Sequence, residues 1–214
     1  DGGVEGLFIP DYLAEAHPEL LTIEGLLANP DLVGNRMHNC PVGWTCQVVA
    51  SQMAKAGGFE AAGIQDFVHG SGETLAASIG SAYTAQEPWF GYYWSPSTVL
   101  GKYPMTQVDL GPHDPVAHPC NADLECATPK LGSWPSSVVT TVVTGTFELS
   151  HPAETDLMRH LSFTNKMMNG LLAWQDANNA TGQEAAAYFL STQQDVWGGW
   201  VNDAARGKLS ALLQ

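Results

Sequence analysis

The pattern of apolar and polar residues predicts strands and helices that alternate along the first half of the chain. Short apolar runs at residues 6–10 and 108–110 predict strands, and the aromatic run at 89–94 predicts a strand that is buried on both faces. Apolar residues recur at helical spacing in residues 47–56 and 73–83. Strands that alternate with helices indicate the α/β class, in which helices cover the faces of a sheet.

The second half of the chain is predicted to contain one strand followed by helices. Residues 136–146 are rich in valine and threonine, which makes them the strongest strand prediction in the chain. From Ser150 onward the pattern is almost entirely helical, and Thr181 with Glu184 forms a capping box that opens a helix at 185–190. The sequence has no internal repeat, which excludes the repeat architectures.

Composition narrows the possible functions. The chain has 214 residues, with 22 Asp and Glu against 8 Lys and Arg, which gives a net charge of −14. An acidic surface repels phosphate groups, so nucleic acids and anionic membranes are poor partners. Hydrophobic residues make up 44% of the chain, enough for a core. No apolar run reaches the ~18 residues that span a bilayer. We therefore expect a folded, soluble protein that does not bind nucleic acid.

Four cysteines form two pairs with identical spacing, and this spacing predicts two local disulfides. Disulfides persist in oxidising compartments, so we expect an exported, periplasmic or extracytoplasmic protein whose signal peptide is absent from the chain. The alternative is a metal site in which His113 and His118 join the second pair. Zinc sites usually have closer cysteine spacings such as C-x2-C, which favours disulfides. The predicted pairs are Cys40 with Cys46 and Cys120 with Cys126.

The loop between Cys40 and Cys46 carries the first candidate binding residues. A disulfide would hold a tight turn directly before a helix, and Trp44 would stand on that turn. The free backbone amides of Thr45 and Cys46 at the helix N-terminus suit a carboxylate. An indole face beside an anion site matches a zwitterion with a quaternary ammonium group. The alternative is a buried Trp44 that covers the disulfide, and the spacing leaves both interpretations open.

Two further tryptophans are candidates for ligand contacts. Trp94 ends the aromatic run where a helix is predicted to begin, whereas Trp89 lies at the start of the run. Ligands of open α/β sheets bind outside the carboxyl ends of the strands, which favours Trp94. Trp134 precedes the predicted strand at 136–146, where it could face a cleft or pack in the core.

Two polar clusters have weaker functional interpretations. The loop at 66–72 carries an aspartate, a histidine and a serine, but it lacks the G-x-S-x-G motif of a nucleophilic serine. Asn121, Asp123 and Glu125 alternate oxygen-bearing side chains that could hold a cation, although the spacing of a calcium loop is absent. We therefore expect no catalytic residues and no cofactor, and the cation site stays open.

Three separated motifs resemble the glycine betaine/proline betaine substrate-binding proteins of ABC importers. The motifs are MHNCPVGWTC at 37–46, EPWFGYYWSP at 87–96 and GWVND at 199–203, in the order of that family. The resemblance implies a two-lobed, hinged periplasmic-binding fold of type II, in which tryptophans enclose the trimethylammonium head group. By motif, Trp44 and Trp94 match two of these walls. The resemblance also implies that the Thr45 and Cys46 amides hold the carboxylate and that Cys40–Cys46 matches a disulfide of part of the family.

The resemblance also divides the chain. Residues 1–10 correspond to the end of lobe I and a hinge strand, residues 11–131 to lobe II, and residues 132–214 to the hinge return and the C-terminal part of lobe I. Relative to the family, the chain is shorter by on the order of a hundred residues, the size of a small domain. We therefore expect an incomplete first lobe, in a chain that is a fragment or is completed by another chain.

The expected function follows from the resemblance. The chain would be the solute-binding component of an ABC importer, and a tryptophan cation–π box would capture glycine betaine, proline betaine, choline or trimethylamine N-oxide. Its partners would be the permease and ATPase of the importer. A sensory or chemotaxis domain of the same fold remains an alternative, because fold and pocket would be shared. A secreted hydrolase would need a base and a nucleophile that the sequence does not offer together.

Overall fold

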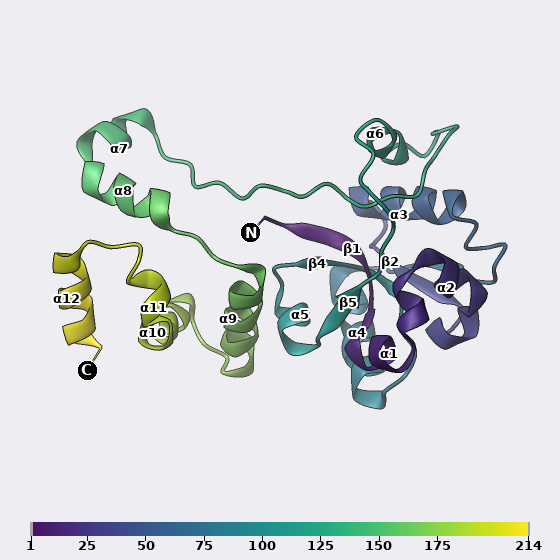
Figure 1. Cartoon of the computed structure of the whole chain (residues 1–214), viewed down its shortest axis with the longest axis horizontal. Coiled ribbons are helices and arrows are strands. Elements are labelled where there is room, and N and C mark those ends of the chain that lie inside the picture. The colour runs from purple at the N-terminus through teal and green to yellow at the C-terminus, as the bar shows by residue number, and fades with distance from the viewer. Residues whose placement is uncertain (1, 214) are drawn as a thin grey trace.

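The computed structural model describes residues 2–213, and a mixed five-stranded sheet forms its centre (Figure 1). The strands lie in the order β3-β2-β4-β1-β5. β2 runs parallel to β3 and β4, whereas β1 runs antiparallel to β4 and β5. The carboxyl ends of β2, β3 and β4 therefore meet at one edge of the sheet. The strands are β1 Val4–Pro10, β2 Arg36–Asn39, β3 Gln65–Val68, β4 Gly91–Ser95 and β5 Met105–Gln107.

Each of the three parallel strands is followed by a helix that begins at this edge. Helix α3 (Thr45–Ala56) follows β2, α4 (Gly72–Ala85) follows β3, and α5 (Thr98–Lys102) follows β4. Local sequence explains where two of them begin, because Ser71 forms a capping box with Thr74 before α4. The Ser97 side chain caps α5 by accepting the Leu100 amide.

The core lies on both faces of the sheet, because strand side chains alternate between the two faces. One face packs against α3, where Asn39 bonds the Gln47 carbonyl and the Ser51 hydroxyl. The other face packs against α4, where the Trp89 indole donates to the Ser78 hydroxyl at 2.9 Å. Four residues of the aromatic run are buried, which confirms the buried strand predicted from the sequence: Trp89, Phe90, Tyr92 and Tyr93.

Further helices lie before β2 and after β5. Before β2, Pro18 opens a short 3-10 helix between two α-helices. The capping box of Thr181 and Glu184 is confirmed, and it opens α10. These helices are α1 Asp11–Ala16, η1 Pro18–Leu21, α2 Ile23–Ala28, η2 Pro30–Val33, α6 Ala117–Asn121, α7 Gly145–Ser150, α8 Pro152–His160, α9 Asn165–Ala177, α10 Gly182–Thr192, α11 Gln194–Trp197 and α12 Asp203–Leu212.

The C-terminal helices extend away from the sheet, and α9 packs against α5 (Figure 1). Asn169 of α9 accepts the Ser97 amide at 2.6 Å and bonds the Ser95 hydroxyl, which attaches α9 to the turn between β4 and α5. Farther out, the rings of Phe189 and Trp200 stack at 5.6 Å. None of the helices within residues 2–213 is both long and apolar enough to cross a membrane.

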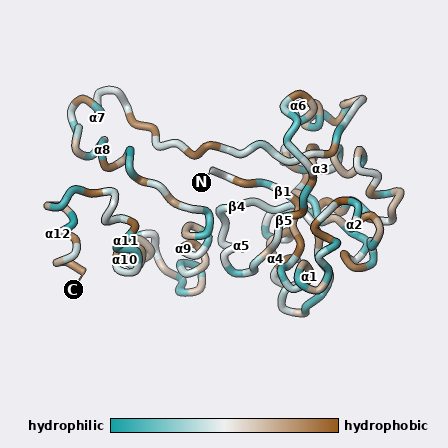
Figure 2. The backbone as a smooth tube through the Cα atoms, in the orientation of Figure 1, coloured by the Kyte–Doolittle hydropathy of each residue, from teal (hydrophilic) through white to brown (hydrophobic). Residues whose placement is uncertain are grey.

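The strand predicted at 136–146 does not form, and this prediction is wrong. Only Ser137 pairs, through an antiparallel bridge to Gly3, and α7 begins at Gly145. The intervening backbone is extended and carries hydrophobic positions away from the sheet (Figure 2). Val138, Val139 and Val142 expose 83%, 73% and 85% of their surface. Strand propensity measures packing against a neighbouring strand, and within residues 2–213 no strand lies beside these valines.

A smaller error concerns the strand predicted at 108–110. The paired residues are Met105–Gln107, three positions earlier, although the Val108 amide still donates to the Leu7 carbonyl at 2.8 Å. Val108 and Leu110 are buried, so their apolar character reflects the core rather than a strand. An apolar run of three residues does not separate these two possibilities.

Candidate ligand-binding site

The candidate site lies at the edge of the sheet where β2, β3 and β4 end. Trp44 lies in the loop after β2 and Trp94 near the end of β4, and α3, α4 and α5 begin at this edge. Backbone amides and the positive end of the helix dipole are thus concentrated at one edge. This arrangement is where open α/β sheets bind their ligands.

The loop after β2 is held in place by covalent and hydrogen bonds. The predicted disulfide between Cys40 and Cys46 is present, and Gly43 has a φ of +88°, a conformation that favours glycine. The Val42 amide donates to the His69 carbonyl at 3.3 Å, which links this loop to the loop after β3. Trp44 then occupies the N-cap position of α3. The backbone of Trp44 is therefore fixed from several sides.

Trp44 and Trp94 lie together although fifty positions separate them in the sequence. Their ring centroids are 5.9 Å apart and their planes are inclined by 57°. Trp44 exposes 42% of its surface, and Trp94 is half-buried on β4. The alternative in which Trp44 is a buried cover of the disulfide is therefore wrong. The Trp94 indole also stacks on Tyr93 at a centroid distance of 4.3 Å, so Trp44 is the more open of the two rings.

Trp134 lies one ring farther along the same face. It packs on Tyr92 with a centroid distance of 5.6 Å, and Tyr92 in turn lies 6.2 Å from Trp94. Trp134 exposes only 7% of its surface. Trp134 is therefore a buried residue that packs against Tyr92, and Tyr92 in turn packs against Trp94.

The amides of Thr45 and Cys46 open the first turn of α3. Within residues 2–213, neither amide donates to a protein acceptor, as is usual for the first positions of a helix. Both lie directly after Trp44, so an anion that bound them would lie beside the indole ring. The helix has twelve residues, and its dipole favours negative charge at this end.

Glu5 is a functional candidate that the sequence interpretation missed. In the register of β1 and β4, Glu5 lies directly opposite Trp94, so both side chains are on the same face of the sheet. The Tyr92 hydroxyl donates to the Glu5 carboxylate, and burial together with this carboxylate raises the pKa of Tyr92. A negative charge therefore stands beside the rings. The sequence signal was a lone acidic residue within an apolar strand.

The histidines near this edge lie on the other face of the sheet. His38 and His69 are hydrogen-bonded at 2.9 Å between Nδ1 and Nε2, and His38 stacks on Trp89. Burial, His69 and Arg36 lower the pKa of His38 to about 4. Burial and Arg36 also lower the pKa of His69. Both imidazoles are thus neutral at pH 7 and act in packing.

The loop at 66–72 does not assemble a nucleophilic triad. The Asp66 carboxylate accepts hydrogen bonds from the Ser51 hydroxyl at 2.5 Å and from the Asn39 amide at 2.8 Å. These partners lie on the α3 face, whereas His69 bonds to His38 on the opposite face. The polar residues of this loop therefore serve two separate networks that hold the strands and α3 together.

The second cysteine pair also forms a disulfide, so its thiolates are unavailable to a metal. In the neighbouring cation candidate, one side-chain oxygen of Asn121 and one of Asp123 accept backbone amides. Asn121 bonds both the amide and the carbonyl of Lys130, and Asp123 accepts the Glu125 amide. Across residues 2–213, no group of three His, Cys, Asp or Glu side chains is arranged to hold a metal ion.

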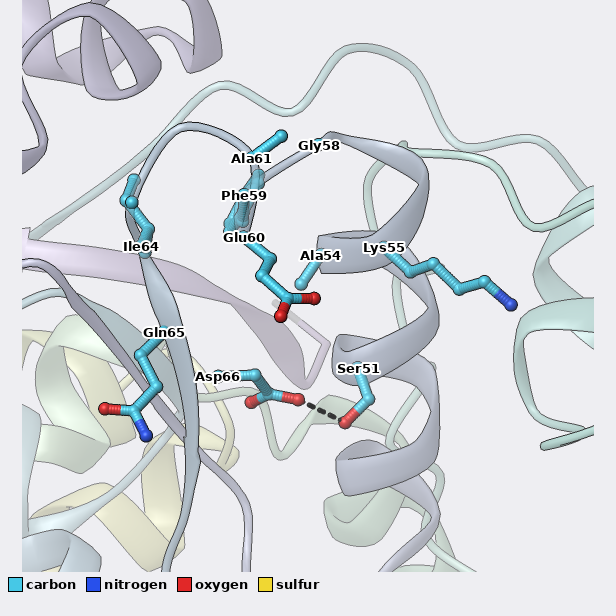
Figure 3. A pocket seen from close by; sticks show the side chains of 11 residues that line it. Ser51, Ala54, Lys55, Gly58, Phe59, Glu60, Ala61, Ile64, Gln65 and Asp66 are labelled. Atoms are coloured by element: carbon cyan, nitrogen blue, oxygen red, sulfur yellow. Dashed lines mark hydrogen bonds between the residues drawn. The ribbon is translucent and has the colours of Figure 1, made fainter.

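A cavity of about 690 Å³ lies between the C-terminal half of α3 and β3 (Figure 3). Ser51 and Asp66 form its floor, Glu60 points into it, and Lys55 points away from it (Figure 3). Gln65 at the start of β3 lines this cavity, so it opens at the edge of the sheet opposite to Trp44. It is therefore separate from the candidate ligand-binding site.

Solved structures show the same fold. A glycine betaine/L-proline-binding protein from Borrelia burgdorferi matches 98% of this chain and 69% of its own, with 18% identity and a TM-score of 0.58. A choline-binding protein in complex with choline matches 100% of this chain and 70% of its own, with 18% identity and a TM-score of 0.53. Lactococcal OpuAC with glycine betaine matches 94% and 68%, with 18% identity and a TM-score of 0.53. No curated protein sequence matches the chain.

Two observations now agree on the family. These neighbours confirm the predicted α/β class and the type II periplasmic-binding fold. The sequence pattern described as the substrate-binding domain of ABC-type glycine betaine transport systems, OpuAC, matches residues 1–192. Because that match covers most of the 214 residues, the chain belongs to the family of substrate-binding domains of ABC-type glycine betaine transport systems.

Proposed function

We propose that this chain binds a small methylated ammonium solute against the indole rings of Trp44 and Trp94 and delivers it to an ABC importer. The observation that carries the proposal is the pair of indole rings, 5.9 Å apart, beside the free amides of α3. Proteins of this family bind small ligands outside the cytoplasm and work with a permease and an ATPase. They bind and release their solute, so no catalytic step is part of this function.

The cationic head group is recognised by aromatic faces and by charge. A quaternary ammonium group has no N–H to donate, so it gains little from hydrogen-bond acceptors and much from ring faces. A desolvated cation–π contact contributes about 2 kcal/mol. The Glu5 carboxylate opposite Trp94 supplies a counter-charge at the same place. Tyr92 holds this carboxylate through its hydroxyl, which keeps it on the face of the rings.

The other end of the solute is recognised at α3. A carboxylate of glycine betaine or proline betaine would accept hydrogen bonds from the Thr45 and Cys46 amides, with the helix dipole favouring its charge. Choline and trimethylamine N-oxide have no carboxylate, so for them these amides would bond the hydroxyl or the oxide oxygen. The four solutes share a methylated, positively charged nitrogen, and the polar group that would meet these amides is a carboxylate, a hydroxyl or an oxide.

The division into lobes is part of the proposal. Residues 11–131 would form lobe II, whereas residues 1–10 and 132–214 would belong to the hinge and to lobe I. The bridge between Gly3 and Ser137 supports this division, because the chain enters and leaves the sheet-bearing part at the same place. Closure of the lobes would cover the solute with further rings, carried by another part of the fold on the same or another polypeptide.

Isothermal titration calorimetry with the four solutes tests the proposal. We expect at least one solute to bind, and we expect Trp44→Ala and Trp94→Ala each to weaken it about 30-fold, which corresponds to about 2 kcal/mol. Trp174→Ala is the matched control, because this tryptophan stacks on Tyr188 between α9 and α10, away from the site. Unchanged affinity in both Trp44→Ala and Trp94→Ala would refute the proposal.

A further inference from the structure

The outer edge of the Trp44 indole rests on Gly72, the first residue of α4. A β-carbon at position 72 would lie 3.2 Å from the Cη2 atom of Trp44 and 3.5 Å from its Cζ2 atom. The shorter distance is tighter than an ordinary van der Waals contact, so the ring would have to move by a few tenths of an ångström. Gly72 is thus the surface against which Trp44 lies.

The backbone at position 72 does not itself require glycine. Gly72 is helical, and unlike Gly43 its φ lies outside the left-handed region. Glycine is less favourable than alanine in a helix, since it loses more backbone entropy on folding. Neither a left-handed turn nor a close backbone contact therefore requires glycine at this position. The contact with the Trp44 ring is the feature that does.

The ring has to respond to a larger residue because its backbone is fixed. The disulfide closes the loop, and the Val42 amide bonds the His69 carbonyl three residues before Gly72. The indole, in contrast, exposes 42% of its surface and is free to turn about its side-chain bonds. A turn of the indole would change its inclination to Trp94, which is 57°.

We propose that Gly72 is a positioning residue that sets the orientation of the Trp44 indole toward Trp94. The consequence for affinity rests on the proposed function, in which these two rings bind the ammonium group. The consequence for the ring itself does not, since the contact between Gly72 and Trp44 exists without a solute. Two kinds of measurement therefore separate the two ideas.

The first measurement follows the ring without any solute. The indole N–H resonance of Trp44 in a ¹H–¹⁵N spectrum is assigned by its loss in Trp44→Phe. We expect Gly72→Ala to shift this resonance. Gly70→Ala is the matched control, because a β-carbon there meets no atom within 4 Å and its φ is also outside the left-handed region. Equal resonance positions in the wild type and Gly72→Ala would overturn the proposal.

The second measurement is a double-mutant cycle on affinity, with glycine betaine and choline as the probes. We expect Gly72→Ala to weaken binding about fivefold, or about 1 kcal/mol, while Gly70→Ala has no effect. Trp44→Phe removes the two indole atoms that the new β-carbon would meet. In the Trp44→Phe background, we expect Gly72→Ala to cause no further loss of affinity. The coupling energy between the two positions would then equal the loss that Gly72→Ala causes in the wild type.

The outcomes of the cycle are decisive in either direction. A fivefold loss that persists in the Trp44→Phe background would show that Gly72 acts through something other than Trp44, and it would overturn the proposal. Thermal unfolding provides a fold control, because alanine at a helical position should leave the melting temperature unchanged or raise it. If neither solute binds the wild type, the proposed function fails, and the resonance of Trp44 still decides the positioning role.

Discussion

Removal of the two disulfides, one at a time, is predicted to have equal effects on stability and unequal effects on binding. Both bridges join cysteines six positions apart, so each closes a loop of the same length. Loop-closure entropy for a ring of about seven residues stabilises the folded state by about 2.4 kcal/mol at 25 °C. Each double alanine variant should therefore lose about this much, equivalent to about 5–10 °C in melting temperature for a chain of this size.

Binding should distinguish the two variants because the loops carry different groups. The loop between Cys40 and Cys46 holds Trp44 and the Thr45 amide, so its release lets the ring and the amides move. The loop between Cys120 and Cys126 begins within α6, and Gln52 of α3 donates to its backbone carbonyls at positions 123 and 124. We expect an affinity loss of about tenfold, or about 1.4 kcal/mol, in the first variant only.

Urea unfolding and titration calorimetry measure the two effects on the same samples. The second variant serves as the control for the first, because it removes an equal covalent constraint at another place. Equal affinity losses in both variants would refute the assignment of the binding site to the first loop. A difference of several kcal/mol in unfolding free energy would instead refute the entropic account of the two bridges.

Two further predictions concern stability. In the folded chain the pKa of His38 is lowered to about 4, so on acidification the unfolded chain binds this proton first. The neutral His38 therefore contributes to folding stability fully above about pH 6.5, and this contribution is lost as the pH falls toward 4. Urea unfolding at pH 7 and 4.5 should therefore show a smaller acid loss in His38→Gln than in the wild type, and an identical loss would contradict the assignment. Asn169→Ala should cost about 1–3 kcal/mol, because it leaves the buried Ser97 amide without its acceptor. Lys102→Ala removes only an exposed ion pair of α5 with α9 and should cost less than about 1 kcal/mol. If Asn169→Ala and Lys102→Ala lost equal stability, the unsatisfied Ser97 amide would not be the cause of the Asn169→Ala loss.

The features that the sequence predicts correctly depend on neighbouring residues. The disulfide loops, the capping box of Thr181 and Glu184 and the start of α3 after Trp44 each follow from chemistry within a few positions. The position of Trp94 at the end of β4 follows from the length of its aromatic run. The short distance between Trp44 and Trp94 follows only when β2 and β4 are taken as parallel, because parallel strands end at the same edge of a sheet.

The features that the sequence did not predict depend on pairing over long distances. Glu5 lies opposite Trp94 only because β1 pairs antiparallel with β4, and the strand at 4–10 does not reveal its partner. Trp134 was expected either at a cleft or in the core, and the choice depended on Tyr92, which is distant in sequence. The predicted strand at 136–146 failed for the same reason, since its residues suit a partner that the described chain lacks.

The exposed stretch from Val138 to Val143 also affects how this chain behaves at high concentration. It reads Val-Val-Thr-Thr-Val-Val in either direction, so two copies in antiparallel register would place every valine opposite a valine. No charged residue occurs between Lys130 and Glu148, and no proline occurs after Pro135 in that interval. Uncharged, β-branched segments of six residues with free backbone groups are the sequences that stack into cross-β assemblies. The net charge of −14 keeps copies apart at low salt, and this protection weakens as salt shortens the range of repulsion.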